Sequence, residues 1–148
     1  MDKINREILT VLQENGRISF ADLGKKVHLS APAVAERVKK LEDAGVITGF
    51  TAKVNFERLG YPIEAMVQAK VFTGKESVFI TQVKKHPEII ECYNVTGEKA
   101  FLLKVLVPTM TKLDSLLEEF SHISETNTMV VLSHIVSKTV IKAPVENH

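Results

Sequence analysis

The segment of residues 30–40 combines residue types that suit contact with a nucleic acid. It begins with the hydroxyl of Ser30 and with small side chains, which let a helix end lie deep in a major groove, where alanine contacts thymine methyl groups. It ends in cations, of which Arg37 suits a guanine edge or a phosphate and Lys40 a phosphate. The candidate DNA-binding residues are therefore Ser30, Ala31, Ala33, Glu36, Arg37, Lys39 and Lys40.

These residues lie on the last of a series of predicted helices. A first helix over residues 2–15, for which Asp2 is the candidate N-cap, has one apolar stripe, which comprises Ile4, Ile8, Val11 and Leu12. Ser19 is the expected N-cap of a second helix over residues 20–27. Ser30 is the expected N-cap of a third, which runs to about residue 44 and stops at Gly45.

The short turn His28-Leu29 makes the second and third helices a helix-turn-helix candidate. Gly24 lies where the second helix must approach the third, so a larger side chain there would push the two apart. Val34, Val38 and Leu41 recur at i, i+4 and i+7 and are expected to point inward. Residues 46–55 alternate loosely around a glycine, as a short hairpin or wing does.

Charge alone leaves the nucleic-acid hypothesis open. Between Arg17 and Leu41 the chain holds six basic and two acidic residues, whereas the net charge of the whole chain is only +1. A local excess of this size suits phosphate contacts, but a plain three-helix bundle with a solvated basic face would have the same count.

The second half of the chain follows a different periodicity. Strands are predicted over residues 63–72, 89–96, 100–107 and 128–136, with residues 140–141 as an extension of the last. Helices are predicted over residues 75–86 and after Pro108, where Met110, Leu113, Leu117 and Phe120 recur at helical spacing. This βαββαβ order is ferredoxin-like, and the sheet face with Met66 and Phe72 needs a partner.

The expected architecture is therefore α+β. It consists of a winged helix-turn-helix domain over residues 1–56, a linker over 57–62 and a ferredoxin-like sensing and oligomerisation domain over 63–148.

The composition of the chain indicates its cellular compartment. With 45% hydrophobic and 25% charged residues, the chain resembles a folded soluble protein, and no apolar run reaches the roughly 18 residues that span a membrane. The first seven residues carry mixed charge, unlike a secretory signal. The single cysteine, Cys92, suits a reducing compartment. We therefore expect a cytoplasmic protein without membrane partners.

No constellation predicts an enzyme, a metal site or a cofactor. The histidines, His28, His86, His122, His134 and His148, fall in different predicted elements without metal-ligand spacing. Cys92 has no evident activating base, and no glycine-rich phosphate loop is present.

Both halves resemble the Lrp/AsnC family of feast/famine regulators. In the first half the resemblance lies in Asn15-Gly16-Arg17, Ala21-Asp22-Leu23, Leu29-Ser30, Glu36-Arg37-Val38-Lys39-Lys40-Leu41-Glu42 and Gly45-Val46-Ile47. In the second it lies in residues 87–97, from Pro87-Glu88 to Thr96-Gly97, and in Leu102-Leu103-Lys104-Val105. The resemblance implies a sequence-specific transcription regulator that binds double-stranded DNA, dimerises through its sheet, and forms tetramers or octamers.

The resemblance also implies an amino acid or related small effector bound between sensor domains. The residues at the matching positions are Gly97, Glu98, Ala100, Met110, Met129, Val130 and Val131. One position departs from the family, whose glycine turn usually reads Gly-x-x-Asp, because Ala100 stands where the aspartate is expected. A carboxylate would pair with the ammonium group of an amino acid, so we expect an altered effector preference or none. The alternative is a purely structural role, in which Gly97 only shapes a turn and Met110 only fills the core.

Two other functions remain open at this point. Relatives of this fold act as decarboxylases in haem biosynthesis, and His134 would be the best candidate for a catalytic group in such an enzyme. The chain would also fit a sensing or oligomerisation protein that does not bind DNA. The cations Arg37, Lys39 and Lys40 favour DNA.

Overall fold

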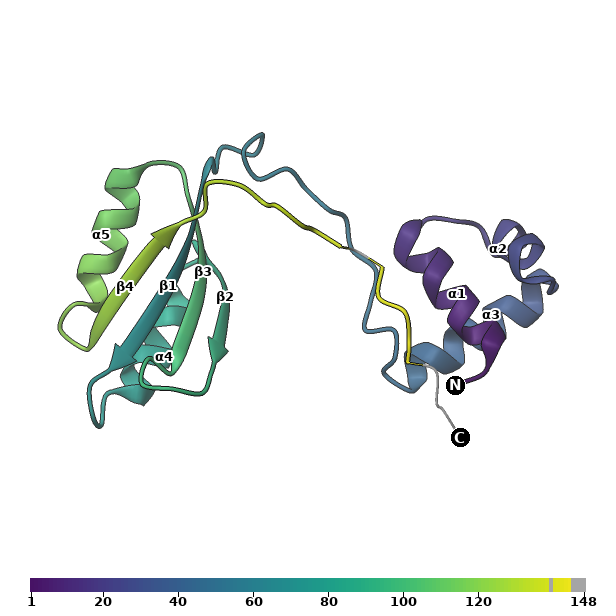
Figure 1. Cartoon of the computed structure of the whole chain (residues 1–148), viewed down its shortest axis with the longest axis horizontal. Helices are drawn as coiled ribbons and strands as arrows, with labels where there is room; N and C mark the ends of the chain where they lie inside the picture. The colour runs from purple at the N-terminus through teal and green to yellow at the C-terminus, as the bar shows by residue number, and fades with distance from the viewer. Residues whose placement is uncertain (139, 145–148) are drawn as a thin grey trace. The chain divides into compact units, whose positions relative to one another are not determined.

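The computed structural model describes residues 1–138 and 140–144, which divide into two compact units (Figure 1). The helical unit comprises Met1–Lys53 and the described residues from Ile135 onward, and the sheet unit comprises Val54–His134. The domain bounds expected from the sequence stay a prediction, but the segment from Ile135 groups with the helical unit rather than with the sheet. No helix in the described ranges has the length and apolar character needed to cross a bilayer.

The helical unit contains α1 (Lys3–Glu14), α2 (Phe20–Val27) and α3 (Ala31–Asp43), as the sequence predicted. Each is capped by the expected side chain, because Asp2, Ser19 and Ser30 each accept the backbone N–H three residues further on. The turn between α2 and α3 contains His28 at φ 58°, in the left-handed region. This conformation reverses the chain within two residues.

A small apolar core holds the three helices together. Ile8, Leu23 and Val34 contribute one fully buried side chain from each helix. The remaining buried members are Leu12, Val27, Val38 and Leu41. The inward orientation predicted for Val34, Val38 and Leu41 is therefore confirmed.

The close approach predicted at Gly24 is also confirmed. A Cβ atom added there would lie 2.4 Å from the carbonyl oxygen of Leu29, in the turn before α3. That distance is far below van der Waals contact, and the obstacle is backbone rather than a flexible side chain. Only glycine fits this position without displacing the turn.

The sheet unit has the predicted βαββαβ order. Its elements are β1 (Ile63–Val71), α4 (Glu76–Lys85), β2 (Ile89–Asn94), β3 (Phe101–Val107), α5 (Met110–Phe120) and β4 (Ser124–Val130). The strands pair antiparallel in the order β2-β3-β1-β4, with α4 and α5 in the same unit (Figure 1). Phe79 of α4 and Phe120 of α5 pack with Val67 of β1 in the shared core.

The other sheet face carries alternate residues of the same strands. On β1 these are Met66, Gln68 and Lys70, which are half-buried, while their neighbours Ala65, Val67 and Ala69 lie in the core. Met66 lies opposite Met129 of β4 in the strand register. This is the face for which the sequence predicted a partner.

The predicted bounds of the last strand were wrong. It was predicted over residues 128–136, but β4 begins at Ser124 and ends at Val130. The N–H of Val131 still donates to the Glu64 carbonyl at 2.8 Å. The ladder stops there because β1 begins at Ile63, and the preceding Pro62 has no N–H to donate. Leu132 and Ile135 beyond it are 95% and 88% exposed.

Two further strand predictions were wrong for the same reason. Residues 46–55 form no strand, and neither do residues 140–141. The side-chain amide of Gln13 makes two hydrogen bonds with the backbone of Ile141. Its Nε2 donates to the Ile141 carbonyl at 3.0 Å, and its Oε1 accepts the Ile141 N–H at 2.8 Å. A sequence with β-propensity forms a strand only where a neighbouring backbone completes the ladder.

The lack of space for a side chain at Gly24 leads to a prediction about stability. Gly24→Ala should lower the free energy of unfolding of the helical unit by about 1–3 kcal/mol, since the new methyl group forces the turn away from α2. Urea unfolding followed by circular dichroism measures the change. Lys26→Ala on the same helix is the matched control, because that side chain is exposed. Equal stability of the two variants would contradict the close approach.

Candidate nucleic-acid interface

The side chains that the sequence assigned to DNA lie on α3 and at its N-cap, and Ala33, Glu36, Arg37 and Lys40 share one edge of this helix. Ser30 caps the helix, and its Oγ accepts the N–H of Ala33 at 3.4 Å. Ala31 and Ala33 follow in the first turn and are half-buried, whereas Glu36, Lys39 and Lys40 are exposed. The helix therefore presents a small-residue start and a charged second half along one continuous element.

Arg37 is the most constrained cation on this helix. Its Nη1 donates to Asp2 Oδ2 at 2.7 Å and to Asn5 Oδ1 at 2.9 Å, so it joins α3 to the start of α1. The side chain is 32% exposed. The hydrogen bond from Arg37 lowers the pKa of Asp2 below its ordinary value, and the N–H of Asn5 lowers it further. The pair therefore stabilises the fold at neutral pH, and that contribution disappears as pH falls through the lowered pKa.

The lysines of α3 are held less firmly. Lys40 Nζ lies 2.6 Å from Glu36 Oε1 one turn earlier, and this hydrogen bond lowers the pKa of the Glu36 carboxyl. Both side chains are largely solvent-exposed, so the pair contributes little stability and can exchange for another partner. Lys39 has no ion pair among the described residues.

The candidate effector residues fall into two groups at opposite ends of β1. The first is the turn after β2, where Gly97 has φ 107°. Glu98 in this turn pairs with Lys70 of β1 at 2.5 Å, which lowers the pKa of the Glu98 carboxyl. Half-buried Ala100 packs against the core, and its carbonyl accepts the N–H of Val95 at 2.7 Å. The Glu98 carboxylate thus already has a cationic partner.

The second group lies where β1 begins. Met129 and Val130 of β4 are opposite Met66 and Ala65, and Val131 follows at Glu64. Met110 opens α5 just after β3, whose Val107 is opposite Ile63. Met110 is 55% exposed, so it does not fill the core of this chain.

The register separates the two groups. The turn adjoins Ala69, which is opposite Phe101, whereas Val130 is opposite Ala65. Four residues of extended strand span about 13 Å. One copy of the chain therefore does not bring all the predicted effector residues together.

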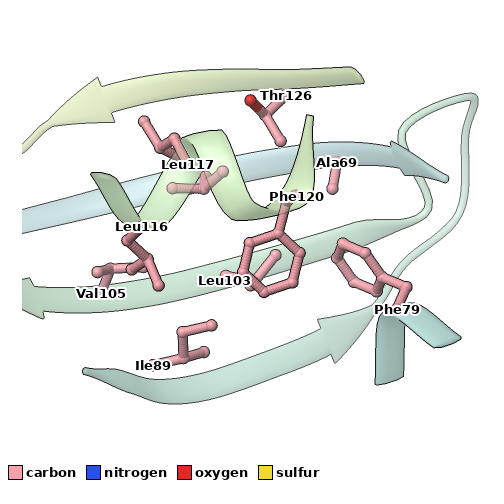
Figure 2. A pocket seen from close by; sticks show the side chains of 10 residues that line it. Ala69, Phe79, Ile89, Leu103, Val105, Leu116, Leu117, Phe120 and Thr126 are labelled. Carbon is pink, nitrogen blue, oxygen red and sulfur yellow. The ribbon is translucent and has the colours of Figure 1, made fainter. Parts of the chain in front are cut away.

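A cavity in the core of the sheet unit is a further place to look for a ligand site. It is apolar, has a volume of about 10 Å³ and is lined by side chains that include Phe79, Leu103, Leu116 and Phe120 (Figure 2). That volume is close to the minimum for a single water molecule. This cavity is therefore too small for an amino acid.

Two of the histidines, His86 and His134, lie beside carboxylates. His134 Nε2 lies 2.8 Å from Glu64 Oε2, and Lys104 lies 3.4 Å from the other oxygen of the same carboxylate. His86 packs beside Phe120 and lies 3.1 Å from Glu119. Burial raises the pKa of the Cys92 thiol, so it is not an activated thiolate. His148 lies outside the described residues, which contain no cluster suited to a metal ion.

Sequence reasoning missed the partners of the charged site residues. Asp2 was expected only to cap α1, and Asn5 and Lys70 were given no role. A carboxylate at an N-cap is a local signal, but its contact with Arg37 joins residues 35 positions apart. No periodicity could have predicted that contact.

Comparison with known proteins agrees with this architecture. Residues 1–42 match the AsnC-type helix-turn-helix domain, and residues 64–141 match the Lrp/AsnC ligand binding domain. Similarity to known relatives extends over nearly the whole chain. The HTH-type transcriptional regulator FL11 of Pyrococcus furiosus is 34% identical over 99% of this chain and 97% of its own.

Solved structures give the same result. The structure of LrpC from Bacillus subtilis has a TM-score of 0.88, with 31% identity over 93% of this chain and 99% of that one. A transcriptional regulator from Neisseria meningitidis, solved as a complex with L-Met, has a TM-score of 0.87, with 30% identity over 99% of this chain and 97% of that one. The chain therefore belongs to the Lrp/AsnC family of helix-turn-helix transcriptional regulators.

Proposed function

We propose that the chain regulates transcription by inserting the edge of α3 into the major groove of an operator. The observation that carries this proposal is the arrangement of one helix: a Ser30-capped start with small residues, followed by exposed Lys39 and Lys40. A capped helix start offers N–H groups to a phosphate, and alanines allow close approach to thymine methyl groups. The lysines further along reach the phosphates that flank the groove.

Within this proposal Arg37 and the lysines have different tasks. Arg37 is held in place by Asp2 and Asn5, which suits a residue that must meet a base edge in a fixed geometry. Lys39 and Lys40 are exposed and mobile point charges, which suits contact with phosphates of any sequence. Lys40 would leave Glu36 and pair with a phosphate when DNA binds.

The regulator acts as an oligomer in this proposal. The sheet face that carries Met66, Leu102 and Met129 would cover the same face of a second copy, and such dimers would assemble further into tetramers or octamers. A dimer places two copies of α3 on one duplex, so the operator should be a pseudo-palindrome with half-sites in register with the helical turn.

The effector site would be completed by a second copy. The glycine turn and the Met110–Met129 end of the sheet are about 13 Å apart along β1, so a contact between copies is the simplest way to bring them together. An amino acid or related metabolite is the proposed ligand class, since the Neisseria meningitidis relative was solved with L-Met. With Ala100 in place of a carboxylate and Glu98 already paired, the ammonium group lacks its usual anchor.

The two kinds of DNA contact lead to different expected losses. Arg37→Ala should cost about 1–3 kcal/mol of operator affinity and relax the sequence preference, as loss of a base contact does. Lys39→Ala and Lys40→Ala should weaken binding to all sequences alike and reduce the salt slope by about 1 each. Gel shifts at several salt concentrations measure both effects. Lys84→Ala on α4 is the control, and unchanged affinity in all three α3 variants would contradict the assignment.

Two substitutions of Ser30 separate its role as the cap of α3 from its role in contact with DNA. Ser30→Ala removes the cap, and the long 3.4 Å bond places the expected loss near the lower end of about 0.5–2 kcal/mol. Ser30→Asp keeps a capping oxygen but puts a negative charge where a phosphate is expected, so it should keep stability and lose DNA affinity.

Thr109→Asp, at the N-cap of α5, is the matched control because it adds the same charge to a cap in the sheet unit. Thermal unfolding and gel shifts separate the two effects. If Ser30→Asp binds DNA as tightly as Thr109→Asp does, the start of α3 does not contact a phosphate.

The departure at Ala100 predicts weak or altered effector binding. Calorimetric titration with the common amino acids should give no tight binding to the wild-type protein. Ala100→Asp should gain affinity for at least one of them, since a charge-assisted hydrogen bond to the ammonium group becomes available. Ala100→Asn has nearly the same shape without the charge and should gain less. Tight wild-type binding of an ordinary amino acid would contradict the expectation.

A further inference from the structure

We propose that Asp2 and Asn5 are positioning residues for DNA recognition, which hold the Arg37 side chain in the orientation that reads the operator. The inference rests on the proposed DNA-binding function of α3. Neither residue belongs to α3, and Asp2 precedes the first helix. Their role would be to act on DNA only through Arg37.

The pattern of donors on Arg37 is the first step of the argument. A guanidinium group has N–H donors on three nitrogens in one rigid plane. Both contacts are made by Nη1, with 2.7 Å to Asp2 Oδ2 and 2.9 Å to Asn5 Oδ1. Nε and Nη2 have no hydrogen-bond partner among residues 1–138 and 140–144. One nitrogen therefore anchors the side chain, and the donors of the other two are not used by these contacts.

The anchor itself is held by the fold. Asp2 Oδ1 accepts the backbone N–H of Asn5 at 2.7 Å as the N-cap of α1, which orients the carboxylate so that Oδ2 meets Arg37. Asn5 contributes its side-chain oxygen from the first turn of the same helix. Two contacts on one nitrogen restrict the rotation of the guanidinium plane more than one contact would.

Burial distinguishes this pair from the other ion pairs of the helical unit. The Arg37 side chain is 32% exposed, compared with 72% for Lys40 in its pair with Glu36. A partly desolvated and doubly bonded arginine loses rotamer freedom when the protein folds, so DNA does not have to remove that freedom on binding. This is the physical benefit that positioning would give.

The opposite interpretation is that Asp2 competes with DNA for Arg37. A competitor would have to occupy the donors that DNA needs, but the occupied donors are confined to Nη1. The two interpretations differ in sign. If Asp2 positions Arg37, removal of its charge lowers discrimination between sequences, whereas if Asp2 competes, removal of its charge strengthens operator binding.

Asp2→Asn tests the inference while it preserves the cap, because an asparagine oxygen also accepts the N–H of Asn5. The probes are a duplex that the wild-type protein selects from a random pool and a scrambled duplex of equal length, both at one salt concentration. We expect the ratio of the two affinities to fall about three- to tenfold, part of what a bidentate base contact contributes. Affinity for the scrambled duplex should stay equal or rise slightly, because a negative charge near the phosphates is lost.

The double-mutant cycle isolates the route through Arg37. In an Arg37→Ala background, Asp2→Asn should leave the affinity ratio unchanged. Glu7→Gln is the matched control, since it removes one carboxylate of α1 that pairs with Lys3 at 3.8 Å and not with Arg37. That variant should keep the wild-type ratio.

Asn5→Ala provides a second variant that leaves the Asp2 cap intact, and it should lower the ratio in the same direction by a smaller factor. Circular dichroism and thermal unfolding establish that each variant is folded. An unchanged or increased ratio in both variants would overturn the inference, as would an equal loss in the Arg37→Ala background. A wild-type protein without preference for any duplex would instead refute the proposed function, and this inference with it.

Discussion

The contact between α2 and the turn before α3 determines how the helical unit presents its surface. Gly24 leaves no room for a Cβ atom, which would lie 2.4 Å from the Leu29 carbonyl oxygen. The Leu29 N–H in turn donates to the Gly24 carbonyl at 2.9 Å. With the backbones locked together over a two-residue turn, the direction of α3 follows from that of α2. The same constraint turns Val34 and Val38 inward and leaves Lys39 and Lys40 exposed.

The charged edge of α3 is organised by contacts of unequal strength. Lys40 and Glu36 form an exposed pair that water or a phosphate can replace. Arg37 is partly buried and bonded to two side chains of the α1 start, so its position is a property of the folded unit. In the proposed function, the fixed Arg37 would discriminate between sequences and the exposed Lys39 and Lys40 would supply general phosphate affinity.

In the proposed function, the sheet unit would bind a small molecule at its surface rather than in its core. Its core cavity of about 10 Å³ is too small for an amino acid, and the residues that the family resemblance connects with an effector lie at opposite ends of β1. A site shared between copies would join effector binding to assembly by geometry alone. It would also explain why Met110 and Met129 are exposed in one copy of the chain.

Local features of this protein could be read from its sequence, because helix periodicity, N-caps and strand alternation depend on residues close together in the chain. The helices from Lys3 to Asp43, their caps and the βαββαβ order were all predicted in this way. The limits of β4 were not, because Ser124 finds a pairing partner on β1 whereas the more apolar Leu132 lies beyond its end. The contact of Asp2 with Arg37 and the separation of Gly97 from Met129 were likewise settled only by tertiary structure. Both depend on which distant backbones lie side by side, and that is a property of the packed chain rather than of any local pattern.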